Sequence, residues 1–348
     1  MRKLMETLVR FCCVSGFLFG TPAIGNPVQV IVAGATVPGA VGEELFLKFR
    51  DNVSAASANI DLKLLIYGEL GSEEQYLASL RRGRVQIGVY SGFAMTGVMP
   101  ELDVLYAPFL FDSADEVDFV IDRYLTQTVS EQLAAVGLHF LRWNEIGFNH
   151  VYGKKPLLTP ADTVGIRFRV ALSRSAELFG KSIGADVIPV NYAELIPALE
   201  TGLVDAGDTS TFIYSRSGIS DNAPYLTLTA HAYAYGLIIA NAHWWNSLNI
   251  IQQQVLSDSL PSMDFIRRGA RESMRRDLDR VASLGIQTHY LTAAQQDAWE
   301  AATVASHAEL IDVIGGNAQS FYDRVLTGKA AFDASTATSN KLDKSRVQ

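Results

Sequence analysis

The chain has 348 residues, of which 48% are hydrophobic and 19% are charged, so it can fill the cores of two ordinary domains. Its formal net charge of −8 argues against nucleic acid as a partner, because polyanions bind to basic surfaces. Both cysteines, Cys12 and Cys13, lie near the N-terminus. Removal of that segment would exclude disulfides, thiolate metal sites and cysteine nucleophiles.

Residues 1–25 have the pattern of a secretory signal peptide. Basic residues come first (Arg2, Lys3 and Arg10), a short apolar stretch follows, and small residues precede a cleavage point near Gly25. No later run approaches the ~20 apolar residues of a transmembrane helix. Because this segment holds three basic residues and one acidic residue, the processed chain has a formal charge of −10. We expect a soluble, exported protein.

The first part of the mature chain alternates strands and helices. Valines alternate over residues 28–32 and predict a strand, and apolar residues at helical spacing from Leu45 to Val53 predict a helix. The same patterns then predict a strand at 60–68, a helix at 72–83, a strand at 85–90 and a helix through Val117 and Ile121. This order is typical of a parallel α/β sheet.

The second part of the chain repeats the alternation and ends in helices. The patterns predict strands at 138–148, 166–170, 185–190, 225–242 and 286–291, and helices at 173–183, from 191, at 247–284 and up to about Leu326. An apolar stripe over 263–281 marks one face of a long helix. We expect two α/β lobes with the ligand in the cleft between them, and a loose C-terminal tail at 331–348.

No catalytic or cofactor motif is present in the sequence. The six histidines lack metal-ligand spacing, and neither a G-x-S-x-G elbow nor a P-loop occurs. We therefore expect no cofactor and no enzymatic activity. His231 and His243, which flank a strand pattern, are interpreted as structural.

Two arginines in the predicted strand at 166–170 are the strongest candidates for chemistry. Ile166, Phe168 and Val170 alternate with Arg167 and Arg169, so both arginines lie on one face of the strand. From the residues alone, that face is either solvated or binds an anion through a guanidinium, whose fork matches the two oxygens of a carboxylate.

Five segments resemble, in order and spacing, the substrate-binding proteins of tripartite ATP-independent periplasmic (TRAP) transporters, in the C4-dicarboxylate-binding-protein-like superfamily. These segments are "YGELGSEEQYLASLRRGRVQIGV", "LDVLYAPFLFDSADE", "LLTPADTVGIRFRV", "IGADVIPVNYAELIPALETGLVDAGD" and "YLTLTAHAYAYGLIIANAHWWNSL". The resemblance implies a two-lobed α/β periplasmic binding protein with a hinge and a long bracing helix. We expect lobe I to comprise 26–146 and 235–274, and lobe II to comprise 147–234 and 275–330.

The resemblance also implies partners and a location. It implies a monomeric periplasmic receptor that delivers an organic acid to a small and a large membrane subunit, with no nucleic-acid partner. A periplasmic sensor of similar fold is one alternative, and an exported hydrolase or isomerase is another.

The resemblance implies that Arg169 holds the ligand carboxylate, whereas Arg167 does not. Asn149 stands where a second arginine is common, and Asp208 and Thr209 replace a frequent acidic–Asn or acidic–Trp pair. An amide cannot neutralise a second charge, so we expect a monocarboxylate ligand. The predicted ligand-binding set is completed by Phe212, Tyr233, Glu69 and Thr36.

Two alternatives concern the charges in this site. Asp208 is considered as part of a cation site beside the ligand, because carboxylate and carbonyl oxygens suit a hard ion; otherwise no metal is expected. If the ligand carries two carboxylates, Arg174 or Arg216 is the next candidate for the second charge.

Overall fold

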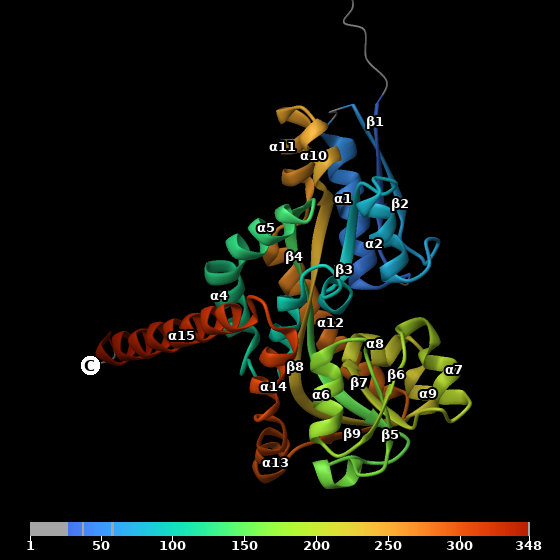
Figure 1. Cartoon of the computed structure of the whole chain (residues 1–348), viewed down its shortest axis with the longest axis vertical. Coiled ribbons are helices and arrows are strands. Elements are labelled where there is room, and N and C mark those ends of the chain that lie inside the picture. The colour runs from blue at the N-terminus through green and yellow to red at the C-terminus, as the bar shows by residue number, and fades with distance from the viewer. Residues whose placement is uncertain (1–26, 37, 57–58, 347–348) are drawn as a thin grey trace, which may run out of the picture.

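The computed structural model describes residues 27–36, 38–56 and 59–346, so the predicted signal peptide lies outside the described part. Figure 1 shows two lobes, as the sequence predicts, and two long strands that join them. The upper lobe begins with the N-terminal strand, and the lower lobe holds the middle of the chain.

The described strands form one mixed sheet that runs through both lobes. Its order is β2-β1-β3-β8-β4-β7-β5-β6, and β9 pairs with β8. The strands are β1 Val28–Ala33, β2 Ile60–Leu65, β3 Ile87–Ser91, β4 Leu138–Gly153, β5 Arg167–Val170, β6 Asp186–Pro189, β7 Ala206–Ser210, β8 Tyr225–Asn241 and β9 Gln287–Tyr290.

Helices cover both faces of this sheet (Figure 1). Those before β5 are α1 Val41–Ala55, α2 Glu73–Arg81, α3 Gly92–Met95, the 3-10 helix η1 Pro100–Tyr106, α4 Ala114–Val120, the π-helix η2 Ile121–Leu125, α5 Thr126–Ala135 and the 3-10 helix η3 Pro160–Thr163. Those between β5 and β8 are α6 Arg174–Ser182, the 3-10 helix η4 Tyr192–Glu194, α7 Leu195–Glu200, α8 Thr211–Arg216 and α9 Ile219–Asn222. Those after β8 are α10 Ala242–Ser247, α11 Ile250–Ser259, α12 Met263–Ser283, α13 Ala293–Thr303, α14 Ser306–Ile314 and α15 Ala318–Arg346.

Strands β4 and β8 connect the lobes. They pair antiparallel along nearly their whole length; in lobe I, β8 also pairs with β3, and in lobe II, β4 pairs with β7. Of the three register shifts in this pairing, two lie where the strands pass between the lobes, at Glu145/Gly147 and at Asn149/Val151 of β4. Such bulges bend strands, so the change of direction between the lobes falls at this crossing.

The long helix α12 braces the crossing from behind. It packs against β4, against α8 of lobe II and against α1 of lobe I. Gly147 has a φ of +105°, and a Cβ built there would lie 2.8 Å from the sulfur of Met274. Only glycine fits this position, because it accepts positive φ and leaves room for α12.

The carboxyl ends of the parallel strands face each other across the lobes. In lobe I, β1 lies parallel to both β2 and β3, and in lobe II, β5 lies parallel to both β6 and β7. Strand β3 is antiparallel to β8, and β7 is antiparallel to β4. Since β4 and β8 run in opposite directions, the two sets of parallel strands end toward each other. This is where α/β sheets place their ligands.

The C-terminal helices depart from the predicted lobe boundary, which places 275–330 in lobe II. Trp299 of α13 does share a core with Phe168 of lobe II. Phe321 and Val325 of α15, however, pack in the same core as Val120 of lobe I. The apolar spacing predicts a buried helix face but does not say which core receives it. We propose that α15 moves with lobe I, whereas α14 packs between η1 and α6.

The tail also differs from the prediction. Helix α15 continues to Arg346, whereas the sequence predicts a helix end near Leu326 and a loose segment at 331–348. No glycine or proline follows Gly328 before Arg346, so nothing in this stretch breaks the helix. In Figure 1 the distal part of α15 leaves the body of the molecule.

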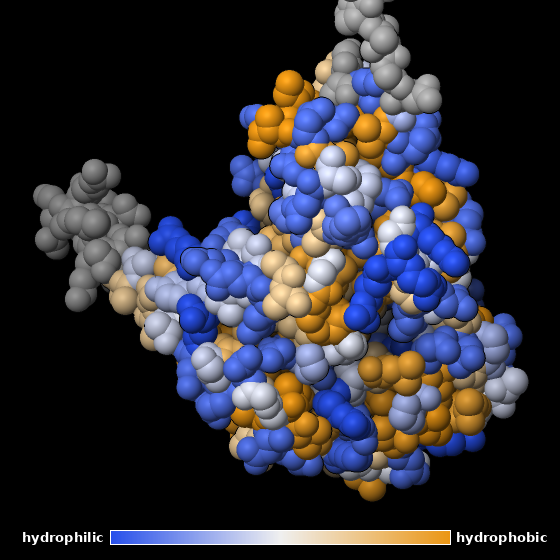
Figure 2. All heavy atoms as spheres, turned by 45° about the horizontal axis from the view of Figure 1, so that its top comes forward, coloured by the Kyte–Doolittle hydropathy of each residue, from blue (hydrophilic) through white to orange (hydrophobic). Residues whose placement is uncertain are grey.

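The surface in Figure 2 is largely hydrophilic, with apolar groups gathered over α10 and α11 at the tip of lobe I. Ile250 and Ile251 are 73% and 67% exposed there. Within the described residues, no helix combines the length and the apolar character needed to cross a membrane.

Candidate functional site

Arg169 and Arg167 lie on one strand but in different surroundings. Arg169 is buried, with 7% of its surface exposed, and its Nε donates a hydrogen bond to the carbonyl of Val190 at 2.9 Å. No acidic side chain of the described residues forms an ion pair with it. Arg167 has half of its side chain exposed and pairs with Asp205 at 2.7 Å. Arg169 is therefore a buried cation without a carboxylate, and Arg167 is already neutralised.

Gly207 allows an aromatic side chain to approach Arg169. In the sheet, Gly207 of β7 stands between Tyr152 of β4 and Arg169 of β5. A Cβ at Gly207 would lie 2.4 Å from the hydroxyl oxygen of Tyr152 and 3.1 Å from the carbonyl oxygen of Arg169. The ring of Tyr152 therefore lies over the glycine. Its hydroxyl is buried and has no hydrogen-bond partner among the described residues.

Two charges of opposite sign, on Arg169 and Asp208, act on the pKa of Tyr152. Burial raises the pKa of Tyr152, the positive charge of Arg169 opposes that shift, and the negative charge of Asp208 adds to it. A free phenol donor therefore lies within the field of the unpaired guanidinium. Such a donor suits an anion better than a cation.

Asn149 and Asp208 contact each other instead of standing free. Nδ2 of Asn149 donates to Oδ2 of Asp208 at 3.1 Å, and Nε2 of His231 lies 3.5 Å from the same oxygen. The His231 ring stacks on Phe179 with centroids 4.0 Å apart, and its Nδ1 lies 2.8 Å from Oγ1 of Thr229. Asp208 is thus the centre of a buried polar network that joins β4, β7 and β8.

This network bears on the alternatives of a metal site and of an enzyme. Among the described residues, no group of three or more histidine, cysteine or acidic side chains is placed to hold a metal ion. The chain of contacts from Thr229 through His231 to Asp208 has the residue types of a nucleophile and its base. Thr229 is fully buried, however, so no substrate reaches its hydroxyl in this arrangement.

Thr209 and Phe212 lie at the carboxyl end of β7. Thr209 is buried and stands opposite His150 in the register of β4 and β7. Phe212 follows in α8, and the guanidinium of Arg216 lies 5.7 Å from its ring centroid.

Burial, with a smaller contribution from His231, lowers the pKa of His150 to about 3. His150 is therefore neutral at physiological pH.

Neither of the alternative arginines is a free clamp. Arg216 pairs with Asp277 of α12 at 2.9 Å, and the carboxylate of Asp277 is fully buried. Arg174 is exposed and pairs with Glu177 within α6 at 3.2 Å. Arg169 therefore differs from Arg167, Arg174 and Arg216 in having no acidic partner.

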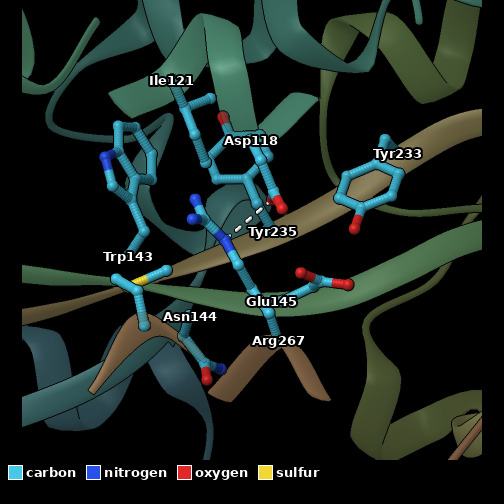
Figure 3. Close-up of a pocket in the computed structure, with 9 residues that line it drawn as sticks. Asp118, Ile121, Trp143, Asn144, Glu145, Tyr233, Tyr235 and Arg267 are labelled. Carbon is cyan, nitrogen blue, oxygen red and sulfur yellow. Dashed lines mark ion pairs between the residues drawn. The ribbon is translucent and has the colours of Figure 1, made fainter. Parts of the chain in front are cut away.

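Tyr233 lines a pocket that does not include Arg169. This pocket, shown in Figure 3, contains none of the other residues predicted to bind the ligand. Burial and then the charge of Glu145 raise the pKa of Tyr233, whose hydroxyl forms no well-aligned hydrogen bond within the described residues. The pocket is lined by Asp118, Ile121, Trp143, Asn144, Glu145, Tyr233, Tyr235, Met263 and Arg267.

The two predicted residues of lobe I lie close to the carboxyl ends of β1 and β2. Oγ1 of Thr36 is buried without a partner among the described residues, and Glu69 accepts a hydrogen bond from the backbone of Tyr67 at 2.7 Å. The Tyr67 hydroxyl donates to Glu43, and this bond lowers the pKa of the Glu43 carboxyl. Tyr67 and Glu43 were not predicted. The signal for Tyr67 is an aromatic residue directly after a predicted strand.

The comparisons with known proteins agree with this architecture. Residues 37–312 match the model of the family described as "Bacterial extracellular solute-binding protein, family 7", DctP. The chain is 24% identical over 325 residues to the C4-dicarboxylate-binding periplasmic protein DctP of Rhodobacter capsulatus, covering 90% of this chain and 95% of that protein.

Solved structures of similar proteins share the fold. The sugar acid binding protein DctPAm of Advenella mimigardefordensis, in complex with galactonate, has a TM-score of 0.81 at 24% identity, covering 87% of this chain and 99% of that one. The periplasmic ectoine-binding protein of the TeaABC TRAP transporter of Halomonas elongata has a TM-score of 0.82 at 20% identity, with the same coverage. Since the family model covers most of its length, this chain belongs to the DctP family of TRAP-transporter substrate-binding proteins.

Proposed function

We propose that this protein is the extracytoplasmic receptor of a TRAP importer and binds an organic monocarboxylate between its lobes, with Arg169 as the carboxylate receptor. The observation that carries the proposal is a buried guanidinium without an acidic partner. A buried charge is costly unless it is paired, so the ligand carboxylate supplies the missing partner. The position of Arg169 near the carboxyl end of β5 agrees with this role.

The preference for one carboxylate follows from the state of the other basic groups. Arg167, Arg174 and Arg216 are each paired with an acidic residue, and the amide of Asn149 is bonded to Asp208. A second ligand carboxylate would lose its hydration without gaining a cation. Similar proteins include receptors for ligands with one carboxylate, such as galactonate, and for ligands with two, the C4-dicarboxylates.

The lobe I side favours a ligand that donates hydrogen bonds. Glu43 and Glu69 place two carboxylates at the carboxyl end of β2, opposite the lobe that carries Arg169. Carboxylates accept hydrogen bonds from hydroxyl or amino groups and repel a second carboxylate. We therefore propose a hydroxylated monocarboxylate, with Tyr152 and Thr209 as further ligand contacts.

Partners and location follow from the family. Its members are extracellular solute-binding proteins, and the ectoine-binding relative belongs to a TRAP transporter. We propose that this receptor acts as a periplasmic monomer and passes its ligand to the small and large membrane subunits of such an importer.

A thermal-shift screen with matched acids tests the proposal. Each hydroxylated monocarboxylate is compared with the diacid of the same carbon chain, for example galactonate with galactarate. An acid at 100 times its dissociation constant raises the stability of the protein by ~2.7 kcal/mol. We expect the shift with at least one monocarboxylate and a smaller shift with its diacid. A C4-dicarboxylate that binds more tightly than every monocarboxylate would overturn the assignment.

A further inference from the structure

Asp103 connects the two lobes through a buried carboxylate. It lies in η1, between Leu102 and Val104 of the lobe I core, and only 2% of its surface is exposed. Its oxygens accept hydrogen bonds from three donors at the start of α6. These are the backbone nitrogens of Arg174 at 2.8 Å and of Ser175 at 3.1 Å, and the hydroxyl of Ser175 at 2.5 Å.

The partner of Asp103 belongs to lobe II. Helix α6 packs Ala176 and Phe179 into the lobe II core beside Phe168 of β5, while its Leu178 contacts the lobe I core. Its N-terminus is already capped locally, because the Ser173 hydroxyl accepts a hydrogen bond from the backbone of Ala176. Asp103 is therefore a second acceptor that comes from another lobe and satisfies amides that a local cap leaves open.

The carboxylate is well matched to this helix end. Burial raises the pKa of Asp103, while the bonds from Ser175 and Arg174 oppose the shift. The positive end of the helix dipole favours the ionised form. Ser175 is itself 1% exposed, so water does not compete for either partner.

The same segment of lobe I contacts lobe II at a second point. The backbone nitrogen of Phe109 donates to the carbonyl of His231 at 2.6 Å, and Phe109 packs against the lobe II core. Phe109 has a φ of +56°, a conformation that a bulky residue adopts only when its surroundings hold it. Residues 103–109 thus span the gap between the lobes.

We propose that Asp103 is an interlobe latch that holds the N-terminus of α6 and so sets the relative positions of the two lobes. Strand β5, which carries Arg169, joins α6 directly through residues 171–173, so the latch acts on the element that holds the anion receptor. This inference rests on the proposed function in assuming that the lobes of a solute receptor move relative to each other. It does not depend on which acid is bound.

Distance measurements on the ligand-free protein test the latch. The chain without residues 1–25 has no cysteine, so Arg82→Cys in lobe I and Glu200→Cys in lobe II, both exposed, give one spin-label pair. Pulsed electron resonance then reports the distribution of interlobe distances. We expect a single narrow distribution in the labelled parent and a shifted or broadened one in Asp103→Ala and Asp103→Asn.

A matched control separates the latch from the general loss of a buried acid. Glu116 is equally buried, but its carboxylate accepts a hydrogen bond from the backbone nitrogen of Asp112 and pairs with Lys329, both on the lobe I side. Glu116→Gln should leave the distance distribution unchanged. Asp103→Asn keeps the side-chain shape and serves if Asp103→Ala does not fold. A distribution identical to the parent in a folded Asp103 variant would overturn the proposal, whatever acid the protein binds.

Discussion

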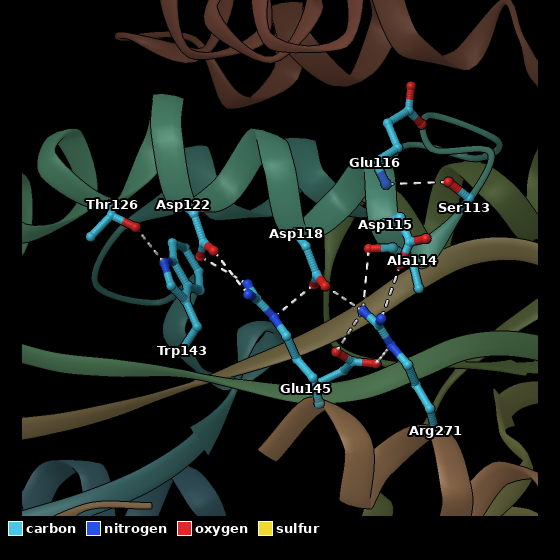
Figure 4. Close-up of polar contacts among 11 residues, drawn as sticks. Ser113, Ala114, Asp115, Glu116, Asp118, Asp122, Thr126, Trp143, Glu145 and Arg271 are labelled. Atoms are coloured by element: carbon cyan, nitrogen blue, oxygen red, sulfur yellow. Dashed lines mark hydrogen bonds and ion pairs between the residues drawn. The ribbon is translucent and has the colours of Figure 1, made fainter. Parts of the chain in front are cut away.

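Arg271 of α12 binds Glu145 of β4 where the chain crosses between the lobes: its Nε lies 3.0 Å from the nearer carboxylate oxygen. The same guanidinium contacts Asp118 at 2.5 Å and Asp115 at 3.0 Å, as Figure 4 shows. Arg267, one turn earlier, pairs with Asp118 at 2.8 Å. These contacts fix the bracing helix to both β4 and α4, immediately before the bulge at Gly147.

We expect Arg271→Ala to destabilise the protein strongly. The side chain of Glu145 is 4% exposed, so loss of Arg271 leaves a buried carboxylate without its main partner. Breaking a buried ion pair in this way costs ~3–5 kcal/mol. Urea unfolding measures the change. Arg276→Ala is the control, because Arg276 pairs with Glu272 on the exposed surface of the same helix and its loss should cost ~0.5 kcal/mol or less. Equal losses in the two variants would contradict the role of the network.

Gly147→Ala should also destabilise the protein, for two separable reasons. The positive φ costs a residue with a Cβ of order 1–3 kcal/mol, and that Cβ would approach the sulfur of Met274 to 2.8 Å. Met274→Ala in the same chain removes only the steric contact. Chemical denaturation should therefore show that Gly147→Ala costs less stability in a Met274→Ala background than in the parent, but still destabilises the protein. If Gly147→Ala costs nothing in that background, the backbone conformation contributes nothing.

Asn149→Arg alone should not create a diacid receptor. The amide of Asn149 lies 3.1 Å from Asp208, so an arginine at this position would pair with that carboxylate. Asn149→Arg combined with Asp208→Asn leaves the new charge unpaired. We expect only the double variant to gain affinity for a diacid relative to its matched monocarboxylate, in competition titrations. A gain of the same size in the single variant would mean that Asp208 does not neutralise the new arginine.

His150 predicts a loss of stability toward acid pH. Its pKa falls from 6.5 to about 3 in the folded protein, so between these values the unfolded chain binds more protons than the folded chain. The contribution of the neutral imidazole is therefore complete above pH 6.5 and declines as the pH falls toward 3. Nuclear magnetic resonance should show no titration of His150 between pH 5 and 8, and His150→Gln should flatten the pH dependence of unfolding in this window. Titration of the folded imidazole near pH 6.5 would contradict its burial.

The sequence predicts the elements well, because alternation and helical spacing are local properties. It also predicts that Arg169 differs from Arg167, through the family resemblance. The structure shows that their surroundings differ: Arg169 is buried without an acidic partner among the described residues, and Arg167 forms an exposed pair with Asp205. Their roles toward a ligand remain a prediction. Neither burial nor the partner at Asp205 follows from the alternation pattern, because both depend on the neighbouring strands.

Other parts of the site depend on long-range geometry that the sequence does not express. The contact of Asp208 with His231 joins β7 to β8, and the bulge beside Asn149 changes which face each following residue occupies. The orientation of Tyr233 toward Glu145 depends on the register shift between Glu145 and Gly147. The packing of Phe321 and Val325 of α15 with Val120 also requires knowledge of both cores, since an apolar helix face fits either one.

The central claim is that Arg169 receives the ligand carboxylate, and isothermal calorimetry of two arginine variants tests it most directly. With the tightest-binding acid from the thermal-shift screen as the probe, Arg169→Ala should lose ~3–5 kcal/mol of binding free energy, or about two to four decades of affinity, because the carboxylate is left unpaired in a buried site. Arg167→Ala, which removes an exposed pair on the same strand, should lose ~1 kcal/mol or less. Circular dichroism establishes that both variants are folded. Equal losses in the two variants, or full affinity in Arg169→Ala, would contradict the account.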